Sequence, residues 1–378
     1  MGKHSRTRYA WGVVASIFLG IALAVPSGGV AKAAASVAAL NGGVAAFEGP
    51  NTDLDLCDVP LNGCTATTLG MEPGSSPAVY SRNNGYVWAA FEANTKTLYI
   101  TERTKTAVVR NINTGYGIAE LTTPAVAGFF DDEVAISDAV FAAWQGSNGD
   151  LDIYTYAAGV GTKAFDTTLK MYPGTSPSLA LTIDNFTGIP YFMVAFANSA
   201  NHLALYGSGD PFDTSNSTIT SPTTLGMEAG TSPSITTTGS GYSAAFEDND
   251  SQLYLTYFDG VVPQSSMTLE NIGLPMYPHT NPSLPQSNID NDFVGDQGEV
   301  DAYMANTGYL CAWNDHAKTQ NCGFNQLVEG NLALTLVGGD YWAAFESPSS
   351  GDFLAYDTAT GSGFVLGMYN GTNAALSP

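Results

Sequence analysis

A glutamate follows a phenylalanine in a recurring Ala-Ala-Phe-Glu motif, at Glu48, Glu92, Glu247 and Glu346. In two copies a tyrosine stands seven residues after the glutamate, at Tyr99 and Tyr254. A carboxylate accepts strong hydrogen bonds from hydroxyl groups, and a tyrosine ring offers an apolar wall with a polar tip. These residue types together suit a small ligand that carries hydroxyl groups. Glu92, Tyr99, Glu247 and Tyr254 are therefore the candidate ligand-binding residues.

The repeated glutamate also has a purely structural interpretation. Strand alternation places it on the face opposite the phenylalanine, near the end of a hairpin. There its carboxylate could accept hydrogen bonds from backbone amides of a neighbouring turn, and it would recur only because the fold recurs. Both interpretations stay open at the level of the sequence.

Catalytic signatures are missing from the chain. It contains no Gly-x-Ser-x-Gly, no His-Glu-x-x-His and no phosphate-binding loop. His202, His279 and His316 are scattered, with no sequence link to a nucleophile. Carboxylate pairs could support glycoside hydrolysis, but among 35 acidic residues some pairs occur by chance. We therefore expect a protein that is not an enzyme and needs no cofactor.

One acidic loop could hold a cation. An insertion at residues 285–308 carries acidic side chains of the kind that bind calcium, namely Asp290, Asp292, Asp296, Glu299 and Asp301. The EF-hand pattern fails because Phe293 stands where the turn glycine is required. A solvated acidic loop without metal is the alternative, and the sequence does not decide between the two.

The elements that position these residues come from an internal repeat. The motif aromatic recurs seven times, at Phe47, Phe91, Trp144, Phe196, Phe246, Trp313 and Phe345. The spacing averages about 50 residues, which is typical of four-stranded propeller blades. Each copy opens with a turn such as Thr-Ser-Pro-Ser, and turn-rich residues separate the motif aromatic from the next strand. One repeat cannot bury both faces of its sheet, so several must stack. The sequence predicts an all-β, seven-bladed β-propeller of four-stranded blades, with about 49 residues per repeat.

The repeat resembles a known family. Gly-Met-x-x-Gly-Thr-Ser-Pro-Ser, then Gly-Tyr-x-x-Ala-Phe-Glu and Leu-Tyr, as found from Gly226 to Tyr254, is similar to the PLL-like β-propeller repeats. The resemblance implies a seven-bladed lectin that binds fucose or related sugars in pockets between blades. It also has departures. The family's usual glutamine after the phenylalanine is mostly glutamate here, and the aromatic after the hairpin leucine is replaced at Asp55, Asp152 and Ala204.

The N-terminus indicates export. Basic residues precede an apolar run, Trp11–Val25, and then Ala31-Lys32-Ala33, the pattern of a cleaved signal peptide. We expect residues 1–33 to be removed and residues 34–378 to form one propeller domain, with no membrane insertion after cleavage. Both ends of that domain contain part of a repeat, so either terminus could complete the ring.

Cysteine content and charge agree with a secreted protein. Cys57 and Cys64 are seven residues apart, and Cys311 and Cys322 eleven apart, which predicts two local disulfides in an oxidising compartment. Zinc is the competing explanation, but neither pair has Cys-x-x-Cys spacing. The net charge of −23 argues against nucleic-acid partners.

The expected function is that of a secreted, multivalent, carbohydrate-binding propeller. The alternative is an extracellular interaction scaffold without sugar sites.

Overall fold

The described residues of the computed structural model form strands and turns, with no helix among them. They comprise residues 43–59, 63–81, 86–104, 107–120, 122–130, 138–157, 161–183, 190–208, 217–220, 223–238, 241–259, 267–285, 300–314, 318–322, 329–337, 340–346, 352–357, 363–367 and 375–377. All of them belong to one unit of the chain, Val37–Pro378. The predicted signal peptide, residues 1–33, lies outside the described residues.

The described strands form seven antiparallel sheets, six with four strands and one with three. The first sheet contains β27 (Ala375–Ser377), β1 (Gly43–Glu48), β2 (Asp53–Val59) and β3 (Cys64–Gly70). The second contains β4 (Ala78–Ser81), β5 (Tyr86–Glu92), β6 (Thr97–Thr104) and β7 (Val108–Gly117). The third contains β8 (Ala125–Phe130), β9 (Asp138–Gln145), β10 (Asp150–Ala157) and β11 (Gly161–Lys170).

The remaining sheets repeat this order of strands. The fourth contains β12 (Ser178–Ile183), β13 (Pro190–Ala197), β14 (Leu203–Ser208) and β15 (Ser217–Thr220). The fifth contains β16 (Ser234–Thr238), β17 (Gly241–Glu247), β18 (Gln252–Asp259) and β19 (Thr268–Pro275). The three-stranded sixth contains β20 (Val300–Met304), β21 (Leu310–Asn314) and β22 (Thr319–Asn321). The seventh contains β23 (Glu329–Val337), β24 (Asp340–Glu346), β25 (Asp352–Asp357) and β26 (Gly363–Gly367).

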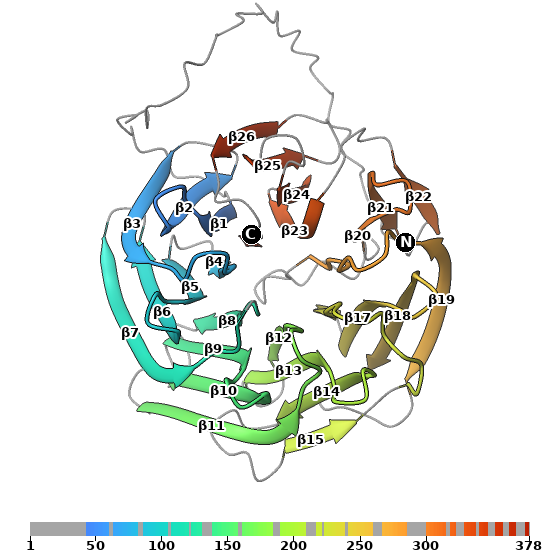
Figure 1. Ribbon diagram of the computed structural model, residues 1–378, viewed down its shortest axis with the longest axis horizontal. Coiled ribbons are helices and arrows are strands. Elements are labelled where there is room, and N and C mark those ends of the chain that lie inside the picture. The colour runs from blue at the N-terminus through green and yellow to red at the C-terminus, as the bar shows by residue number, and fades with distance from the viewer. Residues whose placement is uncertain are drawn as a thin grey trace, which may run out of the picture. The chain divides into compact units, whose positions relative to one another are not determined.

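The sheets of this unit surround a common axis (Figure 1). Inner strands of neighbouring sheets touch: β4 contacts β27 and β8, β12 contacts β8 and β16, and β23 contacts β27. In the sixth sheet Ser283 lies on the inner side of β20, where it bridges to Ala302. The C-terminal strand closes the first sheet, because β27 pairs with β1 from Val44 opposite Ser377 to Ala46 opposite Ala375. The sequence left either terminus able to complete the ring, and in the structure it is the C-terminal one.

The repeated Ala-Ala-Phe segment forms the buried second strand of its sheet. The motif aromatics at positions 47, 91, 144, 196, 246 and 345 are at most 2% exposed. The prediction of Trp313 as the motif aromatic of the sixth sheet is wrong, because Tyr303, 0% exposed and opposite Cys311 as Phe91 is opposite Tyr99, holds that place. The alanines before them, such as Ala89–Ala90 and Ala244–Ala245, are 0% exposed. Small residues allow the sheets to converge near the axis, and each aromatic ring fills the space between two sheets. The predicted hairpins after the motif are confirmed, for example β5–β6 and β17–β18.

Both predicted disulfides are present, and the four cysteines are all paired. Cys57 in β2 lies directly opposite Cys64 in β3, so the first bond joins two neighbouring strands. The second bond, Cys311–Cys322, ties β21 to the residue that follows β22. This bond lies in the sixth sheet, which has the fewest described strands of the seven.

Candidate functional site

A pocket of about 300 Å³ lies between the first and second sheets. The first sheet contributes Leu56, Asp58 and Thr65–Thr68, and the second contributes Val87 and Arg103. Ligand-binding pockets in proteins are concave, largely apolar and supplied with few polar groups, and they begin at about 300 Å³. The pocket thus has the size of a site for one small molecule, and its lining is more polar than is usual for such sites.

Arg103 is the cation of this pocket. Side chains alternate along β6, so Tyr99, Thr101 and Arg103 share the face that is turned toward the first sheet. The Arg103 Nη2 donates a long hydrogen bond of 3.4 Å to the carbonyl of Thr67. Its Nε is buried and has no hydrogen-bond partner. Burial lowers the pKa of Arg103 below its ordinary value, but an arginine stays protonated at physiological pH.

Arg103 differs from other cations in having no carboxylate beside it. Lys96 pairs with Glu120 at 2.7 Å, Lys170 with Asp150 at 2.8 Å, and Lys318 with Glu270 at 3.1 Å. No described carboxylate lies within ion-pair distance of Arg103. A buried charged donor that lacks a partner is costly for the fold. A ligand oxygen placed beside Arg103 would supply the missing acceptor.

Acceptors and apolar surface complete the pocket. Asp58 lines it from β2, and Thr65–Thr68 line it from β3. The Cys57–Cys64 disulfide fixes these two strands against each other. Val44, Leu56 and Val87 contribute apolar wall. A sugar hydroxyl both donates and accepts hydrogen bonds, so an arginine and a carboxylate in one small pocket suit a polyhydroxyl ligand.

The equivalent space between the second and third sheets is filled by side chains. In the strand register Phe91 lies opposite Tyr99, and the equivalent Trp144 lies opposite Asp152. Arg103 follows Tyr99 by four residues, as Tyr156 follows Asp152, so Tyr156 in β10 occupies the position that Arg103 has in β6. The Arg110 guanidinium lies over the Tyr156 ring, 4.2 Å from its centroid. The Arg110 Nε also lies 3.9 Å from a carboxylate oxygen of Glu102. Arg110 therefore closes this interface, whereas Arg103 borders an open one.

The residues predicted to bind a ligand do not lie together within a sheet. Tyr99 is opposite Phe91 in the strand register, whereas Glu92 is opposite Leu98. Tyr254 is likewise opposite Phe246, and Glu247 is opposite Leu253. Because faces alternate along a strand, each tyrosine projects from one face of its sheet and each glutamate from the other. The two residues of a pair face different neighbouring sheets.

The motif glutamates reach the turn that leads to the next sheet. Glu48 Oε2 accepts a hydrogen bond from the Gly74 amide at 3.0 Å, and Glu247 Oε2 accepts one from the Thr280 amide at 3.1 Å. These bonds confirm, for Glu48 and Glu247, the interpretation that the glutamate accepts from a neighbouring backbone turn. Glu92 is equally buried, at 1% exposure. The side chain of Glu346 lies outside the described residues.

The two tyrosines are half-buried between sheets. Tyr99 packs on Phe91 with ring centroids 5.4 Å apart, and Tyr254 stacks on Phe246 at 5.5 Å. The Tyr254 hydroxyl accepts a hydrogen bond of 2.8 Å from Asn271 Nδ2. Both side chains are partly exposed, so each offers some aromatic surface to solvent.

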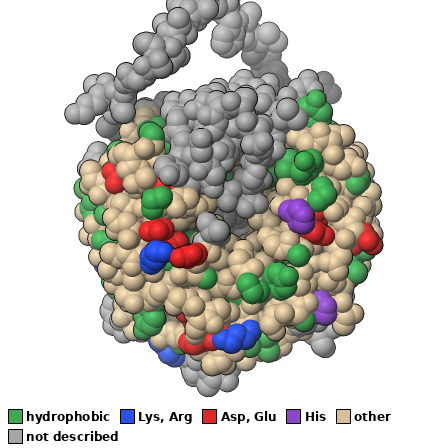
Figure 2. All heavy atoms as spheres, in the orientation of Figure 1, with side chains coloured by type: hydrophobic (Ala, Val, Ile, Leu, Met, Phe, Trp, Pro, Cys, Tyr) green, Lys and Arg blue, Asp and Glu red, His purple; other side chains and the backbone are tan. Residues whose placement is uncertain are grey.

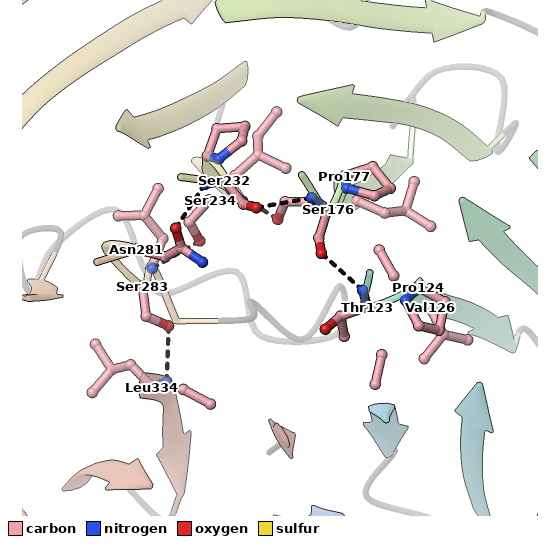
Figure 3. Close-up of a pocket in the computed structure, with 18 of the residues that line it drawn as sticks. Thr123, Pro124, Val126, Ser176, Pro177, Ser232, Ser234, Asn281, Ser283 and Leu334 are labelled. Carbon is pink, nitrogen blue, oxygen red and sulfur yellow. Dashed lines mark hydrogen bonds between the residues drawn. The ribbon is translucent and has the colours of Figure 1, made fainter. Parts of the chain in front are cut away.

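A second pocket, of about 190 Å³, lies on the axis, where the opening turns of six sheets meet. Figure 3 shows Thr123, Ser176, Ser232 and Asn281 following one another around it. The Thr123 amide donates to Ser176 Oγ at 2.8 Å, Ser176 to Ser232 Oγ at 2.8 Å, and Ser232 to Asn281 Oδ1 at 2.6 Å. The repeated Ser-Pro turns therefore link neighbouring sheets, which gives this motif a structural role.

Metal and membrane features are not seen in the described part of the chain. No three histidine, cysteine or acidic side chains come together there as a metal site. The acidic residues of the loop for which calcium binding was left open, Asp290, Asp292, Asp296 and Glu299, lie outside the described residues, as does the side chain of Asp301. Within the described ranges no helix is long and apolar enough to cross a membrane. On the face drawn in Figure 2, acidic and basic side chains lie in small groups rather than in one basic patch.

The sequence did not single out Arg103 or Asp58. Neither belongs to the repeated motif, because the equivalent of Arg103 is Tyr156 in the third sheet. One signal was available: Lys and Arg number only 12 in the chain, and Arg103 shares a strand face with Tyr99. A rare cation on the same face as a candidate tyrosine was thus the one sequence feature that pointed to the residues lining this pocket.

Comparisons with known proteins relate the chain to others through its fold. No family model matches the sequence, and no curated protein matches it. Among solved structures, AofleA from Arthrobotrys oligospora superposes with a TM-score of 0.53 at 11% identity, covering 81% of this chain and 90% of that one. The Aleuria aurantia lectin, described as a six-bladed β-propeller with a novel mode of fucose recognition, gives 0.51 at 10% identity over 79% and 96%. A variant of that lectin in complex with Fucα1-6GlcNAc gives 0.51 at 11% identity over 79% and 97%. These similarities show that the fold is a β-propeller.

Proposed function

We propose that this protein is a secreted, non-enzymatic, carbohydrate-binding propeller, and that the pocket beside Arg103 is a sugar site. The observation that carries the proposal is the buried Arg103 Nε, which has no partner and borders a pocket of about 300 Å³ that Asp58 also lines. Arg103 donates to ring or hydroxyl oxygens of the sugar, and Asp58 accepts from its hydroxyls. Val44, Leu56 and Val87 contact its apolar C–H groups.

The ring is proposed to have seven blades, one for each of the seven sheets. The Aleuria aurantia lectin is described as six-bladed, so this chain would have one blade more. Seven blades agree with the PLL-like repeat pattern of the sequence. Further weak sites on the same ring would raise avidity without any new contact. Tyr99 and Tyr254 are the proposed aromatic walls of such sites, with Glu92 and Glu247 holding the turns between blades.

Fucose-like sugars are the first ligands to consider. A variant of the Aleuria aurantia lectin has been crystallised with Fucα1-6GlcNAc and with α-methyl-L-fucoside, and the PLL-like resemblance implies the same class of sugar. The proposed ligand is a terminal monosaccharide, because about 300 Å³ is at the lower limit of ligand pockets.

The binding test compares wild-type protein with Arg103→Ala, first on a glycan array and then by titration calorimetry with the best sugar. A hydrogen bond to a charged group contributes about 1.5–3 kcal/mol, so the variant should bind roughly 10- to 100-fold more weakly. Lys96→Ala removes an exposed cation and serves as the control, with unchanged affinity. Equal affinity of Arg103→Ala and wild type would refute the Arg103 site.

Export is a separate proposal, in which residues 1–33 are a signal peptide. The two disulfides agree with an oxidising compartment. N-terminal sequencing of protein from the culture medium should begin within a few residues of Ala34. A retained Met1 in a membrane fraction would contradict it.

The second candidate function is an extracellular interaction scaffold. Its supporting observation is the apolar surface on outer strands, where Val108 and Val109 in β7 are each 46% exposed and Ile219 in β15 is 48% exposed. A contiguous apolar patch can mark a protein interface; these side chains lie on two separate blades, so the candidate rests on the adjacent Val108 and Val109. The glycan array separates the two functions, since a scaffold would bind no sugar in either wild-type or variant form.

A further inference from the structure

Three buried carboxyl groups occupy the same position in three blades, at Glu48, Glu92 and Glu247. A fourth blade has Gln145 there, as the last residue of β9. Each of these residues ends the second strand of its sheet, and the side chains of Glu48, Gln145 and Glu247 contact the turn that leads to the next inner strand. The four positions allow an amide and a carboxyl to be compared in one structural setting.

Gln145 shows what the setting requires. Its Oε1 accepts a hydrogen bond of 3.2 Å from the Gly174 amide, and its Nε2 donates one of 3.0 Å to the Tyr172 carbonyl. The turn thus presents one donor and one acceptor to the side chain. An amide matches both.

A glutamate can match both groups only as a carboxylic acid. Glu48 and Glu247 accept from the turn amide through Oε2. In Glu48, Glu92 and Glu247 the other oxygen, Oε1, is buried and has no hydrogen-bond partner. By comparison with Gln145, this oxygen corresponds to the nitrogen that donates to a carbonyl. Two unprotonated oxygens repel a carbonyl, whereas a protonated Oε1 can donate to it.

The surrounding charges favour the neutral acid. Glu48 faces Glu72, and Glu247 faces Glu228 and Asp248. Glu92 faces Glu72 and Glu120, with Lys96 as the opposing cation. Burial is the main cause that raises the pKa of each of the three glutamates to about 7, and the neighbouring carboxylates add to it. Hydrogen bonds from Gly74 and Thr280, and the Ser251 hydroxyl near Glu247, act in the opposite direction.

We propose that Glu48, Glu92 and Glu247 are held as carboxylic acids that bond neighbouring blades, so that the ring is most stable in acid and weakens as they ionise. Each acid joins the end of its own β-strand to the turn before the next blade. Ionisation replaces a donor by a negative charge in a buried place, and the bond between the blades is lost.

The direction of the pH dependence follows from the two states. An unfolded glutamate has a pKa near 4.5, and these three have a folded pKa of about 7. A raised folded pKa means that the folded state binds more protons between these values. The stabilisation is therefore fully present below pH 4.5 and is lost as the pH rises through about 7. Burial and neighbouring aspartates also raise the pKa of Asp55 to about 6 and of Asp152 to about 7, so both act in the same direction.

The test measures the melting temperature from pH 5 to pH 8. For wild type we expect the melting temperature to fall between the unfolded pKa of 4.5 and the folded pKa of about 7, and to level off at higher pH. The triple variant Glu48→Gln, Glu92→Gln, Glu247→Gln should melt higher than wild type at pH 8 and show a shallower dependence, with Asp55 and Asp152 accounting for the remaining slope. The variant Gln145→Glu should make the melting temperature depend more steeply on pH than it does in wild type. Glu270→Gln, at an exposed position of an ion pair with Lys318, is the control and should leave the slope unchanged.

A direct readout covers the case in which a variant folds poorly. In wild-type protein labelled with ¹³C at the glutamate carboxyl carbon, three signals should titrate near pH 7 and should disappear one at a time in the single Glu→Gln variants. The proposal fails if every glutamate titrates near its ordinary pKa, or if the triple variant keeps the slope of wild type.

Discussion

Removal of residues 375–378 is expected to destroy the cooperative unfolding of the ring. The backbone of β1 from Val44 to Ala46 would lose the partner strand that β27 provides. Ala45 and Ala46 are 0% exposed, so the freed amides and carbonyls would lie in a poorly hydrated place. Each buried unpaired group costs about 1–3 kcal/mol. Several of them would remove a large part of the roughly 5–15 kcal/mol that stabilises a typical domain.

Urea unfolding followed by circular dichroism measures this effect. The shortened chain should show a broad transition at low urea, whereas the full chain should show one steep transition. Adding a synthetic peptide of residues 371–378 is the matched control, because it restores the strand without the covalent link and should raise the midpoint. A shortened chain with the midpoint of the full chain would mean that β27 does not close the ring.

Replacement of Phe246 by alanine is expected to cost about 3–5 kcal/mol of unfolding free energy. Phe246 is 0% exposed and fills the space between the fourth and fifth sheets, in a cluster with Leu205 and Met227. Removing the ring also takes away the surface on which Tyr254 stacks. The surrounding strands are held by their own pairing and cannot collapse fully into the cavity.

Tyr254→Phe is the matched control for Phe246→Ala. It keeps the stacked ring and removes only the hydroxyl that accepts from Asn271, so it should cost about 0.5–1.5 kcal/mol. Chemical denaturation measures both changes in unfolding free energy, provided that the m-value is the same in the variants and wild type. If the two variants were equally stable, the motif aromatic would not be a core residue, and the repeat would have another cause.

Much of the fold could be predicted because the chain repeats. The spacing of the motif aromatics gave the all-β class, the hairpins and the number of repeats that matches the seven sheets. The disulfides followed from the short separations within each cysteine pair. Ring closure could not be predicted, because Gly43–Glu48 and Ala375–Ser377 each resemble part of a repeat, and only the pairing of β27 with β1 distinguishes them.

The candidate site was less predictable, for a physical reason. A motif that recurs in many blades indicates what the fold requires. Glu48 and Glu247 accept hydrogen bonds from the turns between blades. A binding site depends on what differs between blades. Arg103 and Tyr156 occupy equivalent positions, yet one borders a pocket and the other lies under the Arg110 guanidinium. Such a difference becomes visible only once the strand register and the facing side chains are known.

The most direct test of the central claim is a crystal structure of the protein with the sugar that binds best on the glycan array. The account predicts electron density for one terminal monosaccharide in the pocket between the first and second sheets, with a sugar oxygen within hydrogen-bond distance of Arg103 Nε. Density only in the axial pocket around Ser176 and Ser232, or no density beside Arg103 in crystals soaked to saturation, would contradict it.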